Sequence, residues 1–220
     1  MSGSHALAPG VLSIKLSCKE SAALMSGLAH KVPITAADYL AWEVDQIERH
    51  DFVDGEVYAM SGGEDRNATA AGNVYIALCE HLRGTPCHVY AVGVRLHVTA
   101  SDNYFYPDVM VTCSEADRAS RLAKSDPVLI IDVLSKSTEA YERGEKFANY
   151  RAIDTLAEYV MIDINARHVD LYRKGADGLW VLHPTAMTQV DASINFESVK
   201  LKLDAATLFA DLEGENHATA

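Results

Sequence analysis

Residues 127–134 read PVLIIDVL, an apolar run with a single charged residue, Asp132. A strand with apolar side chains at successive positions is covered on both faces, as in a sheet that lies between helices. Residues 104–111, YFYPDVMV, form a second run of this kind around Asp108. An unpaired carboxylate in an apolar layer costs several kcal/mol, so both acids need partners that stabilise their charge.

Helix signals recur along the chain. Thr35, with Asp38 three residues later, has the spacing of a capping box and predicts the start of a first helix. Apolar residues that recur at intervals of three and four predict a second helix over 66–83. A third helix is expected to start at Ser137 or Thr138 and to end near residue 153.

Strand signals fall between these helices. Strands are predicted at 52–60 (a hairpin around Asp54-Gly55), 88–98, 104–113, 128–134, 158–164, 168–174, 179–183 and within 200–212, where a short closing helix also fits. This order of elements predicts a sheet with helices on its faces, in one domain of the α/β or α+β class.

Composition sets limits on the class of protein. Of the 220 residues, 49% are hydrophobic and 23% are charged, as in ordinary globular proteins. Residues 31–212 are expected to form the domain, with a disordered or upstream segment at 1–30 and a flexible acidic tail at 213–220. No stretch approaches the roughly 20 apolar residues that span a bilayer, so no membrane partner is expected. Four cysteines without a C-x-x-C pair argue against structural zinc and for the reducing cytoplasm.

The net charge of −12 argues at first against a polyanionic partner. Residues 38–65 hold nine acids and one base, and residues 204–220 hold four acids and no base. These two segments account for the whole net charge, so the rest of the chain is neutral. The acidity is therefore local and does not exclude binding to nucleic acid.

Glu56 follows the Asp54-Gly55 turn and could join Asp108 and Asp132 in a cluster of three carboxylates. Like charges at short range raise one another's pKa unless a cation neutralises them. Oxygen ligands at a polar cleft suit Mg²⁺ or Mn²⁺ rather than zinc or copper. Alternatively, either aspartate alone could cap a helix or pair with an arginine, which would be a purely structural role.

Lys146 lies in the segment YERGEKFANY of the third predicted helix. At spacings of four residues it shares a helix face with Glu142 and with Tyr150. An acid four residues before a lysine is also the favoured order for an exposed ion pair without a role in function. Lys136, in LSKST near the expected start of that helix, is the alternative candidate for a catalytic lysine.

The segments FVDGEVYAMSGG, AGNVYIALCEHL, YFYPDVMV, DPVLIIDVLSKSTEAYERGEKFANY and EYVMIDI occur in this order between about residue 34 and about residue 174. Together they resemble the Uma family, a bacterial branch of the PD-(D/E)XK, or restriction-endonuclease-like, superfamily. The resemblance implies a single-domain restriction-endonuclease-like fold of the α/β (α+β) class, with a mixed central sheet flanked by helices. It also implies a metal-dependent site that hydrolyses phosphodiester bonds.

The motif residues of that family can be carried over one by one. Asp108 matches the acid of the PD motif, Asp132 matches the acid of the D-x-K motif, and Glu56 is the acid that precedes the core. Leu134 stands where the superfamily lysine usually stands. The lysine is therefore expected to have moved to the following helix, as Lys146.

The resemblance implies an endonuclease that depends on Mg²⁺ or Mn²⁺, cuts nucleic acid (DNA is expected) and leaves a 5′-phosphate. The expected metal ligands are three carboxylates and one backbone carbonyl: Asp108, Asp132, Glu56 and Val133. Lys146 would stabilise the charge that develops in the transition state, and Tyr150 could position Lys146 or a phosphate. Cutting both strands of a duplex would favour a homodimer.

Two departures from the family pattern leave a second function open. The family mostly has Glu where this chain has Asp132, and it often has His near the start of the second helix, where this chain has Asn67. The alternative function is that of a catalytically attenuated PD-(D/E)XK-fold module, which binds nucleic acid or another protein without cutting.

Overall fold

The structure is a computed structural model and describes residues 34–60, 64–91, 93–135, 139–189 and 191–212. Every described residue belongs to one compact unit, within Ile34–Ala220. The segments expected at 1–30 and 213–220 lie outside the described residues, as does the expected helix start with Lys136, Ser137 and Thr138.

The larger sheet has six strands in the order β11-β10-β9-β8-β6-β3. β8 and β9 run parallel, and the other neighbouring pairs run antiparallel. The strands are β3 (His88–Ala91), β6 (Val109–Thr112), β8 (Pro127–Val133), β9 (Glu158–Asp163), β10 (His168–Lys174) and β11 (Trp180–Ala186). The apolar run at 127–134 thus becomes a central strand, β8, as its composition predicts.

A second sheet has five strands in the order β2-β1-β5-β4-β7, in which only β4 and β7 run parallel. Its strands are β1 (His50–Val53), β2 (Glu56–Ala59), β4 (Arg95–Val98), β5 (Asn103–Phe105) and β7 (Ala123–Lys124). A separate hairpin pairs β12 (Ser193–Phe196) with β13 (Leu201–Asp204). The expected α/β class with mixed sheets and flanking helices is confirmed.

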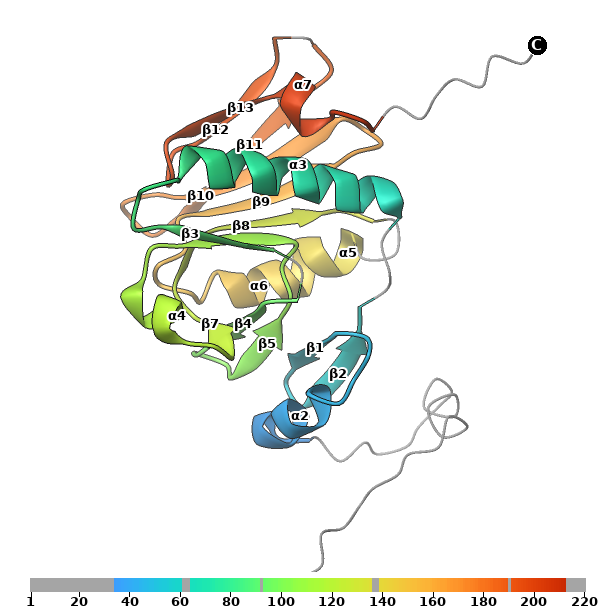
Figure 1. The fold of residues 1–220 in the computed structure, drawn as a ribbon, viewed down its shortest axis with the longest axis vertical. Coiled ribbons are helices and arrows are strands. Elements are labelled where there is room, and N and C mark those ends of the chain that lie inside the picture. The colour runs from blue at the N-terminus through green and yellow to red at the C-terminus, as the bar shows by residue number, and fades with distance from the viewer. Residues whose placement is uncertain (1–33, 61–63, 92, 136–138, 190, 213–220) are drawn as a thin grey trace, which may run out of the picture. The chain divides into compact units, whose positions relative to one another are not determined.

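Alternate residues of the central strands face two separate apolar clusters. Leu129, Ile131 and Val133 of β8 pack with α3 (Asp65–His81), which crosses this sheet in Figure 1, and with α7 (Ala205–Leu208). Ile130 packs on the opposite face with α6 (Phe147–Tyr150). Because side chains alternate along a strand, Asp132 is directed to the same face as Ile130, toward the α6 side.

Two predicted strands are each divided between the two main sheets. The run at 104–113 splits into β5 and β6, with Pro107 between them, which has no N–H to continue a ladder. The run at 88–98 splits into β3 and β4 around Gly93, whose φ of 88° lies in the left-handed region. The prediction of continuous strands is wrong at both places, and Asp108 consequently lies where the chain passes from one sheet to the other.

The sequence predictions for the first helix and the first hairpin agree with the structure. The Thr35 side chain accepts a hydrogen bond from the Asp38 N–H (3.1 Å) at the start of α2 (Ala36–Glu43), so the capping box is confirmed. The β1–β2 hairpin turns through Asp54 (φ 51°) and Gly55 (φ 85°), as predicted. Three short elements were not predicted: α4 (Glu115–Ala119), β7 and β12. Among the described residues, no helix combines the length and apolar composition needed to cross a bilayer.

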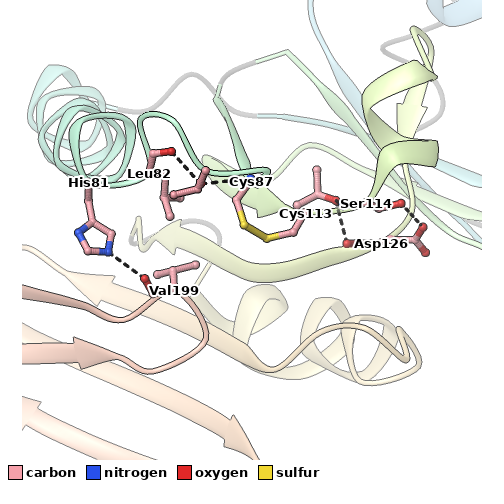
Figure 2. The surroundings of a disulfide bond; sticks show 9 residues. His81, Leu82, Cys87, Cys113, Ser114, Asp126 and Val199 are labelled. Carbon is pink, nitrogen blue, oxygen red and sulfur yellow. Dashed lines mark hydrogen bonds between the residues drawn. A yellow bond between two sulfur atoms is a disulfide. The ribbon is translucent and has the colours of Figure 1, made fainter.

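Cys87 and Cys113 form a disulfide, with their Cα atoms 4.0 Å apart (Figure 2). They extend the antiparallel pairing of β3 with β6, in which His88 lies opposite Thr112. The expectation of four unpaired thiols is therefore wrong, because strand register and not spacing in the sequence brings these two residues together. Cys79 on α3 is a free and partly exposed cysteine.

Candidate active site

The two aspartates of the apolar runs lie side by side on neighbouring strands. Asp132, in β8, is 1% exposed, and Asp108 immediately precedes β6, the antiparallel neighbour of β8. Asp108 Oδ2 accepts a hydrogen bond from the Val133 N–H (2.7 Å), and Asp132 Oδ1 accepts one from the Asp108 N–H (3.3 Å). The carboxylate of each aspartate is therefore held by a backbone N–H group of the neighbouring segment.

Lys146 supplies the positive charge at this pair. Its Nζ lies 3.2 Å from Asp132 Oδ1, and the lysine is 3% exposed. Glu142 is also buried, so the alternative of an exposed Glu142–Lys146 ion pair is wrong. Burial lowers the pKa of Lys146, but the neighbouring carboxylates, first Asp132 and then Asp51, raise it by more. The ammonium group consequently keeps its proton.

Lys146 ends a π-helical turn rather than lying on a regular α-helix. The expected third helix consists of α5 (Glu139–Tyr141), the π-helix η1 (Glu142–Lys146) and α6. Turns with hydrogen bonds from residue i to i+5 are rare and occur often at functional sites. The end of this turn directs the lysine toward Asp132, on the face of the sheet that α6 covers.

Two buried tyrosines surround the Asp132–Lys146 pair. The Tyr159 hydroxyl donates to Asp132 Oδ2 (3.0 Å), which leaves Oδ1 to Lys146. The Tyr150 ring lies 5.9 Å from Lys146 Nζ, and its hydroxyl has no hydrogen-bond partner among the described residues. Tyr150 is fully buried and its ring packs against Lys146, so its contacts fit the positioning of Lys146.

The third acid of the cluster is Asp51 rather than Glu56. Glu56 is exposed at the start of β2, and its carboxylate accepts a hydrogen bond from the Tyr58 hydroxyl (3.0 Å). Asp51, on β1, is 4% exposed, and its Oδ1 accepts from the Tyr106 N–H (3.0 Å). Its Oδ2 lies 3.5 Å from the Tyr141 hydroxyl, which donates to it. The structure thus brings Asp51 toward the buried pair and leaves Glu56 at the surface.

The backbone carbonyl of Val133, an expected metal ligand, already has a neighbour. Asn67 Nδ2 donates to Leu134 O (3.0 Å) and lies 3.4 Å from Val133 O. Asn67 therefore ties the start of α3 to the end of β8. This is a structural role for the residue that stands where the family often has a histidine.

Asp108 and Asp51 lie in an environment that resists their ionisation. Burial raises the pKa of Asp108 to about 6, and the Asp132 carboxylate adds to this, while the Val133 N–H and Lys146 oppose it. Burial also raises the pKa of Asp51 to about 6, against the opposing effect of Lys146. One ammonium group thus serves several carboxylates, and further positive charge would stabilise the cluster.

The donor atoms of this cluster fit a hard divalent cation. Among the residues that the structure describes, no group of three or more His, Cys, Asp or Glu side chains stands ready to hold a metal ion. The adjacent pair of Asp108 and Asp132 offers only oxygen atoms, which Mg²⁺ and Mn²⁺ prefer. A cation at the pair would offset the repulsion from Asp132, which adds to burial in raising the pKa of Asp108.

Comparison with known proteins gives relatives over most of the chain. The Uma2 family, described as "Putative restriction endonuclease", matches residues 36–205. Two relatives come from Synechocystis sp. (strain ATCC 27184 / PCC 6803 / Kazusa). "Uncharacterized protein slr1290" is 36% identical over 149 residues, which cover 68% of this chain and 78% of the relative. "Uncharacterized protein sll1609" is 32% identical over 170 residues, which cover 76% of this chain and 95% of the relative.

A solved structure supports the same fold. The crystal structure of "a putative nuclease belonging to DUF820" from Anabaena variabilis ATCC 29413 superposes with a TM-score of 0.68 at 14% identity. The superposition covers 82% of this chain and all of the Anabaena chain. The fold is therefore shared, and the family match spans the acid pair, the lysine and both tyrosines around them. This chain belongs to the Uma2 family of restriction-endonuclease-like proteins.

Proposed function

We propose that this protein is a metal-dependent endonuclease that hydrolyses phosphodiester bonds of DNA. The observation that carries the proposal is the buried Lys146–Asp132 contact directly beside Asp108. A buried ammonium group among several carboxylates has no evident structural need, because removal of the charges in favour of apolar residues is often neutral or stabilising. The chain also belongs to a family described as "Putative restriction endonuclease", which supports a chemical role for this contact.

Asp108 and Asp132 are the residues that would hold Mg²⁺ or Mn²⁺, with Asp51 in the place expected for Glu56. A bound divalent cation lowers the pKa of water and stabilises charge on a phosphoryl oxygen. Val133 O, with the Asn67 amide beside it, is a weaker candidate ligand than the sequence suggested.

Lys146 would stabilise the negative charge that develops on the phosphate, because it is cationic and lies in a water-poor site. Tyr159 keeps Asp132 in its present orientation, and Tyr150 packs against Lys146. We propose products with a 5′-phosphate, as the family resemblance implies. We also propose the cytoplasm as the compartment and a homodimer as the assembly.

A second candidate function is a DNA-binding or protein-binding module with an attenuated site. One observation favours it: the described part of the chain contains no group of three or more His, Cys, Asp or Glu side chains placed to coordinate a metal ion. The two candidates differ in whether the protein cleaves DNA when Mg²⁺ or Mn²⁺ is present.

A plasmid-nicking assay with Mg²⁺ or Mn²⁺, and with EDTA as the blank, tests the proposal. Asp51→Asn should slow cleavage by roughly 10² to 10³, the usual cost of losing an electrostatic group at a reaction centre. Glu56→Gln is the matched control and should cleave like the parent, because Glu56 is exposed and bound to Tyr58. Absence of cleavage in the parent with either metal, or equal loss in both variants, would contradict the proposal.

A further inference from the structure

Two tyrosine rings, those of Tyr58 and Tyr141, lie beside Asp51 of the acid cluster. Tyr58 is directly opposite Asp51 in the β1–β2 ladder, so the two side chains lie on the same face of that hairpin. Tyr141, just before η1, donates to Asp51 Oδ2 (3.5 Å). The Tyr58 and Tyr141 rings have centroids 5.9 Å apart and planes inclined by 30°. This pair is called the tyrosine platform below.

The tyrosine platform differs from the other aromatic rings around the site in its access to solvent. Tyr150 and Tyr159 are fully buried, whereas Tyr58 is 37% exposed. The Tyr58 hydroxyl donates to Glu56 Oε2 (3.0 Å), which orients the ring. Burial raises the pKa of Tyr58 to about 12, so the ring is uncharged at neutral pH. An uncharged, oriented aromatic ring on a partly exposed residue therefore lies beside Asp51.

The surface around this platform is poorly suited to the backbone of duplex DNA. Residues 38–65, which include β1 and β2, hold nine acids and one base. Proteins that bind a duplex rely on lysine and arginine contacts to phosphates, and this segment lacks them. Stacking of a base on an aromatic ring adds affinity of its own to any phosphate contact, because every base has a π face. In a duplex that face is covered by neighbouring bases, so a base must be unpaired to use the platform.

We propose that Tyr58 and Tyr141 stack the base of a nucleotide next to the bond that is cut, so that the substrate is DNA with unpaired bases at this position. The proposal rests on the proposed function for the location of the scissile phosphate at Asp108, Asp132 and Lys146. Tyr58 makes the contact with the base, and Tyr141 supports the Tyr58 ring while it holds Asp51. The platform would therefore determine the specificity of the site.

The test is a binding experiment in EDTA, where no cleavage occurs. A fluorescent single-stranded oligonucleotide is compared with a set that carries one abasic site, moved one position at a time. Tyr58→Leu should weaken binding to the intact strand by about 5-fold to 100-fold, the usual effect of losing one stacked base. At one abasic position, parent and variant should bind equally, and Tyr58→Phe, which keeps the ring but loses the hydrogen bond to Glu56, should bind the intact strand more tightly than Tyr58→Leu. Trp42→Leu is the matched control, since Trp42 is also 37% exposed but lies on α2, and its loss should change nothing.

Two results would overturn the platform: an equal loss for Tyr58→Leu on the intact strand and on every abasic strand, or tighter binding of the parent to duplex than to single strand. The proposed nuclease function can be refuted independently of the platform. If base-dependent binding is present and no metal supports cleavage, the platform stands and the proposed function is refuted.

Discussion

Neutralising Asp108 should stabilise the protein in the absence of metal, which is the reverse of what a structural aspartate does. The pKa of Asp108 is raised from 3.8 to about 6, and a shift of one unit corresponds to about 1.4 kcal/mol. The upper limit for the relief is therefore about 3 kcal/mol. Asn also weakens the hydrogen bond from the Val133 N–H, because a neutral acceptor replaces a charged one, at a cost of about 1 kcal/mol. We expect Asp108→Asn to gain about 1 to 2 kcal/mol at pH 7.5.

The gain must depend on pH in a defined direction. A carboxyl group whose pKa is raised on folding keeps its proton in the folded state at pH values where the unfolded chain has already lost it. The parent protein thus loses stability as the pH rises from about 4 to about 6 and changes no further above that. The advantage of Asp108→Asn should grow across the same window and then stay constant.

Thermal unfolding in EDTA at several pH values measures this effect. For a protein of this size, a gain of 1 to 2 kcal/mol corresponds to a rise in Tm of about 2 to 8 °C. Asp117→Asn is the control, because Asp117 is 3% exposed and accepts hydrogen bonds from the N–H groups of Ser125 (2.7 Å) and Asp126 (3.0 Å). That variant should lose stability at every pH. A lower Tm for Asp108→Asn at pH 7.5, or a gain that is the same at pH 4.5, would refute the reasoning.

Two further predictions concern the buried ion pair and the disulfide. Lys146→Met should lower the free energy of unfolding in urea by about 3 to 5 kcal/mol, because it leaves Asp132 buried without a cation. The double variant Lys146→Met/Asp132→Asn should recover most of this loss, and a double variant that stays equally unstable would contradict the pairing. Reduction of the Cys87–Cys113 disulfide, or the double substitution to Ser, should cost about 3 to 4 kcal/mol in the same assay, from a loop of 26 residues. Cys79→Ser is the control and should respond to reductant like the parent.

Sequence reasoning identified those parts of the fold that depend on patterns of residues close together in the chain. The capping box at Thr35, the turn at Asp54-Gly55 and the unbroken apolar composition of β8 each depend on residues close together in the chain. The same local logic singled out Asp132, since an acid in such a strand needs a partner. The choice of Lys146 followed from the family resemblance, because the position where the superfamily lysine usually stands is occupied by Leu134, which carries no charge.

The choice between Asp51 and Glu56 could not be made from the sequence. Both acids lie in one hairpin and on one face of it, since Asp51 is opposite Tyr58 and Glu56 is opposite Val53. Which of them approaches Lys146 depends on how the five-stranded sheet meets the six-stranded one. That arrangement follows from the passage of the chain at Pro107, where a continuous strand was predicted. The disulfide escaped prediction for a similar reason, because it depends on the register of β3 with β6.

The π-helical turn before α6 makes the geometry of the site depend on the number of residues in a segment. In an α-helix five residues rotate through about 500°, so Tyr141 and Lys146 would point about 140° apart. In a turn with bonds from i to i+5, each residue rotates through a smaller angle than in an α-helix, so residues five apart point closer to the same direction. Tyr141 can therefore meet Asp51 while Lys146 meets Asp132. A deletion of Gly144, which lies between them, would separate these two contacts without removing any side chain that touches an acid.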